Sequence, residues 1–228
     1  MGENVTFSAN GGTGSGYLAK AASGKGPGVI VIQEWWGLND QIKGVADQFA
    51  REGFTALAPD FYHGKSARIG EPDDAQKLMM DLFQSNSAAK DARGAAGYLA
   101  KHPAVSSRRV GVIGFCMGGG LALLTAAEAP DAIAAVVDCY GVGQDLTGRA
   151  ARIKAPVLGI FGGKDHSMPG ALEDVAKGLR QSGARFEKQV YPQADHAFLN
   201  EQRKDVYRPD DAKDAWSKIM RFLKDNVR

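Results

Sequence analysis

The chain has 228 residues, of which 44% are hydrophobic and 24% charged, and its formal net charge is +2. These totals predict one α/β domain over residues 1–228, and the mixing of acids with bases excludes the basic run typical of nucleic-acid binding. Two cysteines are too few for a disulfide framework, and the first residues lack a signal-peptide pattern. No apolar run approaches the ~18 residues of a membrane span. We therefore expect a cytoplasmic protein that binds neither nucleic acid nor membrane.

Strand patterns alternate with helix patterns along the chain. The first half of the chain predicts a hairpin of strands Val5–Ala9 and Tyr17–Lys20 around a glycine-rich turn at 10–16, a strand at Gly28–Gln33, a helix at 40–51, a strand at Phe54–Ala58, a short helix around Leu78 and a helix at Ala88–Lys101. The second half predicts a strand near 110–113 followed at once by a helix, strands at Ala132–Tyr140 and Pro156–Phe161, a helix at 170–181, a strand at Phe186–Tyr191 and a helix at about 210–225. This alternation favours a mostly parallel sheet with helices on both faces. Ligands of such sheets bind outside the carboxyl ends of the strands, so we expect reactive residues there.

The most distinctive stretch is 109–124, where a strand pattern runs through a glycine-rich turn into a helix pattern. Gly114 and Gly118 bracket Cys116 as glycines bracket the serine of a G-x-S-x-G nucleophile elbow. Such a sharp turn strains the backbone of the nucleophile and leaves no room for side chains at the bracketing positions. The next N–H, that of Met117, would begin a helix and could stabilise an oxyanion. The alternative is a glycine-rich turn with a buried structural cysteine.

Two other strand ends carry residues that could activate a thiol. Asp165 follows the Pro156–Phe161 strand, and His196 follows the Phe186–Tyr191 strand. The order of nucleophile, acid and histidine is the chain order of α/β-hydrolase triads. Because a thiol is mostly protonated at pH 7, His196 would act as its base. Asp165 would fix the tautomer of the imidazole and stabilise its charged form.

Alternative residues exist for the acid and for the base. Asp195 is the immediate neighbour of His196, so its side chain is badly placed to reach the ring, whereas Asp138 follows an earlier strand and is the better rival to Asp165. His166 is the other histidine kept as a candidate, because it adjoins Asp165.

Glu34 directly follows a fully apolar strand and precedes two tryptophans. The strand-end rule places its carboxylate near the rim of the predicted site. The alternative is an exposed loop acid, which is the commoner environment for glutamate. The loop follows the strand that normally supplies the second oxyanion N–H of the hydrolase fold, and here that N–H would belong to Trp35.

Five blocks of the sequence resemble the dienelactone hydrolase family, namely Gln33–Asn39, Ala58–Tyr62, Gly114–Gly119, Gly163–Asp165 and Asp195–Phe198. The resemblance runs over nearly the whole chain. It implies an α/β-hydrolase fold with little or no lid, a triad of Cys116, Asp165 and His196, and no cofactor or metal. It also implies that Glu34 pairs with the resting thiol and takes the proton of Cys116 once substrate binds. His196 would then serve mainly in the later acyl-transfer steps.

The sequence departs from the family where substrate charge is recognised. Members that open dienelactone hold its carboxylate with two arginines, one in the segment matching residues 70–78 and one four residues after the catalytic histidine. Here the first segment has no arginine and the second position is Asn200. Arg68 and Arg203 lie near these positions and are candidate replacements, and Trp36 is a further candidate for contact with substrate.

These patterns together predict a cysteine-dependent hydrolase of small esters or lactones, working as a monomer or small homo-oligomer. A general carboxylesterase acting on neutral esters is one alternative. The other is a non-catalytic redox sensor that uses Cys116 as a low-pKa thiol. A sensor has no use for Asp165 and His196 at separate strand ends. Its only possible resolving cysteine, Cys139, is expected to lie in the core because it falls inside an apolar run.

Overall fold

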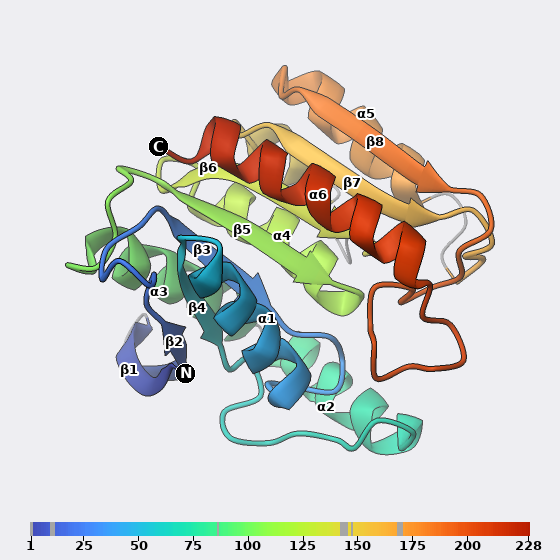
Figure 1. The fold of residues 1–228 in the computed structure, drawn as a ribbon, viewed down its shortest axis with the longest axis horizontal. Helices are drawn as coiled ribbons and strands as arrows, with labels where there is room; N and C mark the ends of the chain where they lie inside the picture. The colour runs from blue at the N-terminus through green and yellow to red at the C-terminus, as the bar shows by residue number, and fades with distance from the viewer. Residues whose placement is uncertain (1, 10–11, 86, 142–145, 147, 168–170) are drawn as a thin grey trace.

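The computed structural model describes residues 2–9, 12–85, 87–141, 146, 148–167 and 171–228. Eight strands form one sheet in the order β1-β2-β4-β3-β5-β6-β7-β8, with β1 and β2 antiparallel to their neighbours and the other strands parallel (Figure 1). The strands are β1 (Glu3–Ala9), β2 (Gly12–Ala19), β3 (Gly28–Ile32), β4 (Thr55–Pro59), β5 (Val110–Phe115), β6 (Ile133–Cys139), β7 (Val157–Gly162) and β8 (Phe186–Tyr191). The helices are α1 (Asp40–Arg51), α2 (Pro72–Gln84), α3 (Ser87–Lys101), α4 (Met117–Glu128), the 3₁₀ turn η1 (Ala150–Arg152), α5 (Ala171–Ser182) and α6 (Pro209–Asn226).

Helices cover both faces of the sheet, as the alternation of patterns predicts (Figure 1). Helices α1 and α6 bury their apolar sides against one face, and α3, α4 and α5 pack on the other. Every residue of β3, β4, β5 and β6 is buried, because strands covered on both faces meet no solvent. This is the mostly parallel α/β-hydrolase architecture that the sequence predicts. Within the part of the chain that the structure describes, no helix is long and apolar enough to cross a membrane.

Helix α4 differs from the surface helices because it is apolar on all sides, and nearly all of its residues are buried. It packs on β5 and β6 at the centre of the sheet. Helix α1, by contrast, has a polar outer face and a capped start, where the Asn39 side chain accepts the N–H of Ile42 at 3.1 Å. Helix α4, which directly follows Cys116, is therefore enclosed by core residues.

The glycine-rich N-terminal segment corrects one expectation. Strand β2 begins at Gly12 rather than at Tyr17, so most of the predicted turn is strand, and residues 10–11 lie outside the described residues. A side chain at Gly16 would lie 2.6 Å from the carbonyl oxygen of Ala58, and one at Gly14 would lie 2.6 Å from the Phe7 ring. These glycines permit close approach of neighbouring groups within a strand, which is the other common use of glycine there.

Two helix boundaries also differ from the sequence-based expectation. The short helix expected around Leu78 runs over the whole of Pro72–Gln84, with its proline in the first turn, where the missing N–H costs nothing. The helix expected at 170–181 is found at Ala171–Ser182, and residue 170 lies outside the described residues.

Candidate active site

Cys116 lies at the sharp turn between β5 and α4, as the glycine spacing predicts. Its φ of 54° and ψ of −125° fall in a region that non-glycine residues rarely adopt. A side chain at Gly114 would overlap the backbone of Gly118, and one at Gly118 would overlap the carbonyl oxygen of Gln33. The turn is therefore possible only with glycine at both bracketing positions, and it holds the half-buried thiol at the carboxyl edge of the sheet.

Asp165 and His196 lie in the loops after β7 and β8, and the structure brings them into contact. The Nδ1 atom of His196 lies 2.7 Å from Oδ2 of Asp165. The other carboxylate oxygen accepts the backbone N–H of Ser167 at 3.0 Å. Sequence reasoning did not single out Ser167, although an aspartate side chain commonly accepts the backbone N–H of the residue two positions later.

The protonation of this pair follows from its contacts. Burial by itself would raise the pKa of Asp165, but hydrogen bonds from His196 and Ser167 outweigh it and lower the pKa to about 2. Burial by itself would lower the pKa of His196, but Asp165 and Cys116 together raise it to about 10. Cys116 is thus among the groups that raise the pKa of His196. Cys116, Asp165 and His196 each follow the carboxyl end of a parallel strand, so all three lie at the same edge of the sheet.

The rival acids are not bonded to His196 in this structure. Asp138 is 3% exposed and its Oδ1 accepts the N–H of Gly141 at 2.9 Å, while burial raises its pKa to about 8. Asp195 and His166 are exposed to solvent. Cys139 is fully buried, which confirms that it belongs to the core.

Glu34 is buried rather than exposed, so the loop-acid alternative is wrong. Its side chain is 2% exposed, and it accepts hydrogen bonds from Asn200 Nδ2 at 2.9 Å and from the Tyr140 hydroxyl at 3.3 Å. Burial raises its pKa, and these hydrogen bonds together with the charge of His196 only partly offset that effect. Neither hydrogen bond goes to the Cys116 thiol.

Tyr140 connects Glu34 to the histidine. Its ring meets that of His196 edge-to-face with centroids 5.2 Å apart, while its hydroxyl reaches Glu34. Its backbone N–H donates to the carbonyl of Ile160 in β7 at 2.7 Å. Sequence reasoning gave neither Tyr140 nor Asn200 a role beside Glu34, because both lie more than a hundred residues from it in the chain.

The two N–H groups expected to form an oxyanion hole belong to Trp35 and Met117. Among the described residues, neither N–H has a hydrogen-bond acceptor. Tyr62 joins their two segments, because its hydroxyl lies 3.1 Å from the carbonyl oxygen of Trp35 and 3.3 Å from the sulfur of Met117. Burial raises the pKa of Tyr62, and the nearby Cys116 adds to the shift, so Tyr62 stays a neutral hydroxyl at the site.

The three residues predicted to contact substrate, Trp36, Arg68 and Arg203, have different environments in the structure. Trp36 is 3% exposed and packs into a small cluster with Ala67 and Ala75, which does not favour contact of its ring with a ligand. The Arg68 side chain is 88% exposed. Arg203 is held by Asp205, with Nε at 3.0 Å and Nη2 at 2.7 Å from the two carboxylate oxygens. The charge of Arg203 is therefore already paired.

The described residues contain no cluster of three or more histidine, cysteine, aspartate or glutamate side chains that could hold a metal ion. The chemical groups at this edge of the sheet are the half-buried thiol of Cys116, the hydrogen-bonded imidazole and carboxylate of His196 and Asp165, and the buried carboxyl group of Glu34.

Comparisons with known proteins agree with the sequence resemblance. A model of the dienelactone hydrolase family matches residues 15–227. The chain is 43% identical to the protein named "Protein usf" from Aquifex pyrophilus, with 99% of each chain covered. It is 37% identical to a protein from Aquifex aeolicus named "Putative carboxymethylenebutenolidase", with 98% of each covered. A solved structure from Klebsiella pneumoniae, named "Putative Dienelactone Hydrolase", is 30% identical and superposes with a TM-score of 0.82 over 98% of both chains.

Proposed function

The chain belongs to the dienelactone hydrolase family of carboxylic ester hydrolases, and we propose that it cleaves small esters or lactones with Cys116 as nucleophile, His196 as proton carrier and Asp165 as the partner of that histidine. The observation that supports the proposal is the strained turn that holds Cys116 at the carboxyl end of β5, at the sheet edge where Asp165 and His196 lie 2.7 Å apart. Backbone strain of this kind persists only where the surrounding structure enforces it, and it is concentrated at functional sites.

The first chemical step is attack of the thiolate on the carbonyl carbon of the substrate. Negative charge develops on the carbonyl oxygen, and the N–H groups of Trp35 and Met117 are the donors available to it. The C–O bond of the ester then breaks and the alcohol leaves with a proton from His196, which gives a thioester on Cys116. In a lactone the alcohol stays attached to the acyl chain.

The second step is hydrolysis of the thioester. His196 accepts a proton from a water molecule, the resulting hydroxide attacks the carbonyl carbon, and the acid is released as the thiolate re-forms. Asp165 keeps its negative charge throughout because its pKa is about 2, so it can stabilise the imidazolium in both steps.

Glu34 is proposed as the group that takes the thiol proton when substrate binds. A general base works best when its pKa lies near the working pH, and burial shifts the pKa of Glu34 upward. The carboxyl group would have to exchange one of its hydrogen bonds, to Asn200 or Tyr140, for the thiol of Cys116.

The proposal is tested by alkylation of the free enzyme with iodoacetamide while hydrolysis of p-nitrophenyl acetate is followed. Cys116 should react much faster than Cys139, because thiolate character and access govern alkylation and Cys139 is fully buried. Activity should fall in proportion to the labelling of Cys116. Full labelling of Cys116 with activity intact would overturn the proposal, and so would inactivation that follows Cys139.

One observation favours preference for neutral substrates near the thiol. Asn200 stands where an arginine would hold a carboxylate, and Arg203 is already paired with Asp205. A charge-assisted hydrogen bond contributes ~1.5–3 kcal/mol, which corresponds to about ten- to a hundredfold in kcat/KM. We expect neutral aryl esters and neutral lactones to be cleaved at least as well as dienelactones of similar size. A thousandfold preference for dienelactone would contradict this.

A further inference from the structure

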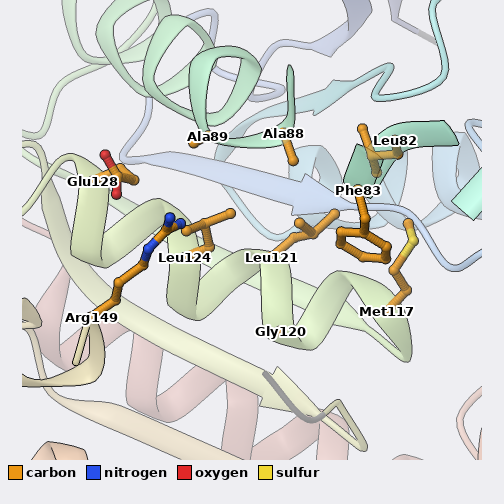
Figure 2. Close-up of a pocket in the computed structure, with 10 residues that line it drawn as sticks. All are labelled: Leu82, Phe83, Ala88, Ala89, Met117, Gly120, Leu121, Leu124, Glu128 and Arg149. Atoms are coloured by element: carbon orange, nitrogen blue, oxygen red, sulfur yellow. The ribbon is translucent and has the colours of Figure 1, made fainter. Parts of the chain in front are cut away.

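A groove of about 330 Å³ runs beside helix α4, with mainly apolar side chains along its length and Glu128 and Arg149 at one end. Figure 2 shows its lining, in which side chains of α4 point toward the end of α2 and the start of α3. Six of the lining residues carry the argument, and they are Phe83, Ala89, Met117, Leu121, Leu124 and Arg149. The α4 members repeat at intervals of three or four residues, so they form one continuous stripe along the helix.

The near end of this groove is the beginning of α4, next to the nucleophile. Met117 follows Cys116 directly, lines the groove with its side chain and offers its backbone N–H to the proposed oxyanion. Its sulfur also contacts the Tyr62 hydroxyl. Met117 therefore borders both the thiol and the groove, and its unbranched thioether is the most adaptable apolar side chain for such a boundary.

The far end of the groove carries two charged side chains, Glu128 and Arg149. Glu128 lies there but is engaged by Arg93 at 2.7 Å and by Arg152 at 3.5 Å. Arg149 lines the same end and, within the described part of the chain, has no carboxylate at ion-pair distance. Figure 2 shows its guanidinium reaching across α4 toward Leu124. An anion at this end would meet a half-buried arginine.

We propose that this groove receives the acyl chain of the substrate, and that the preferred chain is linear, apolar and anionic at its far end. This inference rests on the proposed function, because it assumes an ester bond at Cys116. Met117 and Leu124 are seven residues apart, which is about 10 Å along the helix and matches the extended length of roughly eight carbons. The apolar lining favours the chain, and Arg149 favours a terminal carboxylate.

The first test is a series of p-nitrophenyl esters from acetate to dodecanoate. Each buried methylene contributes enough for up to about fourfold in kcat/KM, so kcat/KM should rise with chain length and level off beyond about eight carbons. A profile that falls steadily from acetate onward would overturn the assignment.

A matched pair of substitutions locates the effect. Ala89 is half-buried on the first turn of α3 and lines the groove, whereas its neighbour Lys90 is exposed and does not. Ala89→Trp should fill the groove and lower the octanoate-to-acetate ratio of kcat/KM by at least tenfold, which is the loss of about two buried methylenes. Lys90→Trp adds the same bulk outside and should leave the ratio near that of the parent. An equal effect of both variants would overturn the assignment, with thermal unfolding of each measured alongside.

The charge at the far end is tested with the monoester of an eight-carbon dicarboxylic acid, mono-p-nitrophenyl suberate. Because Arg149 is only half-buried, the parent should prefer it to the octanoate ester by about two- to fivefold. Arg149→Gln should abolish that preference and leave the rise with chain length in place. If the parent shows no preference, the anionic terminus is wrong.

Failure of this inference is distinguishable from failure of the proposed function. If acetate is hydrolysed through Cys116 but longer chains give no gain, the groove assignment falls and the proposed function stands. If no ester is hydrolysed, the proposed function falls and the substrate role of the groove falls with it.

Discussion

Two carboxyl groups of the candidate site, Asp165 and Glu34, have opposite electrostatic environments. Asp165 lies in a loop at the edge of the sheet and receives hydrogen bonds from an imidazole and from Ser167, which hold its pKa at about 2. Glu34 lies in the loop after β3, is almost fully buried and receives hydrogen bonds from a neutral amide and a phenol, so burial dominates and its pKa is raised. Depth of burial and the charge of the hydrogen-bond partner together decide which carboxyl group is a permanent anion.

This difference suits two roles. A carboxylate that never binds a proton can hold an imidazolium through both halves of an acyl transfer. A carboxyl group whose pKa lies closer to neutral pH can accept a proton and release it again.

The largest effect should come from the Asp165–His196 pair. We expect His196→Ala and Asp165→Asn each to lower kcat/KM by several orders of magnitude, because members of a catalytic unit depend on one another. The double variant should be little worse than the worse single variant. Steady-state hydrolysis of p-nitrophenyl acetate, with circular dichroism to confirm folding, measures both. Additive losses would mean that the two residues do not act as a unit.

Glu34→Gln should have the next largest effect. The substitution keeps shape and hydrogen-bonding capacity but removes the base, and a positioned general base contributes ~10²–10⁴-fold. Because some thiolate forms even without a base, we expect a loss of about ten- to a hundredfold, with a melting temperature near that of the parent. The loss should shrink as pH rises from about 6 to 9, since thiols ionise without help at alkaline pH. Parallel pH profiles of equal height would remove Glu34 from the mechanism.

Substitutions at Asn200 and Tyr140 should change the pKa of Glu34 without removing its carboxyl group. Each stabilises the charged form of Glu34, so removing either hydrogen bond should raise its pKa and move the acidic limb of the kcat/KM profile to higher pH. Asn200→Ala removes the shorter bond and should shift the limb by about one pH unit, because a hydrogen bond to a charged group contributes ~1.5 kcal/mol. Tyr140→Phe should shift it less. A change in height without a shift would show that these residues act only on packing.

The smallest effect concerns stability, and it contrasts Asp165 with Asp138. Asp165 has a lowered pKa in the folded protein, so its stabilising contribution is present above about pH 4 and is lost as pH falls toward 2. Asp138 has a pKa raised to about 8, so its contribution is present below about pH 4 and is lost as pH rises toward 8.

The Asp138→Asn substitution tests the predicted loss of stability that accompanies ionisation of Asp138 as pH rises. The amide keeps an oxygen for the N–H of Gly141 but cannot ionise. The parent should lose at least ~1 kcal/mol of unfolding free energy relative to the variant between pH 5 and pH 8. Urea denaturation at the two pH values measures this. In Asp165→Asn, the comparison variant, unfolding free energy should be lower than in the parent at both pH values, and this deficit should disappear only as pH falls from about 4 toward 2. Identical pH dependence of the parent and Asp138→Asn would show that Asp138 does not titrate in this range.

The amino-acid sequence by itself determines the order of strands and helices and the position of the thiol. Runs such as Val29–Ile32 are β-branched throughout, and this continuous apolar pattern is typical of a strand buried on both faces of a sheet. Gly114 and Gly118 mark the turn at Cys116 because no other residue fits there. Asp165 and His196 follow strand ends, so the parallel sheet brings them to one edge. All of these signals are local, or follow from a general rule of topology.

Only the tertiary structure decided what surrounds each of these groups. The burial of Glu34 depends on Tyr140 and Asn200, which lie 106 and 166 residues further along the chain, and no local pattern encodes such a contact. The same holds for Arg203, whose charge is paired with Asp205, and for Trp36, which packs into a cluster instead of facing a ligand. Burial and hydrogen-bond partners set the pKa of a carboxyl group, and both are properties of the packed molecule rather than of any segment of it.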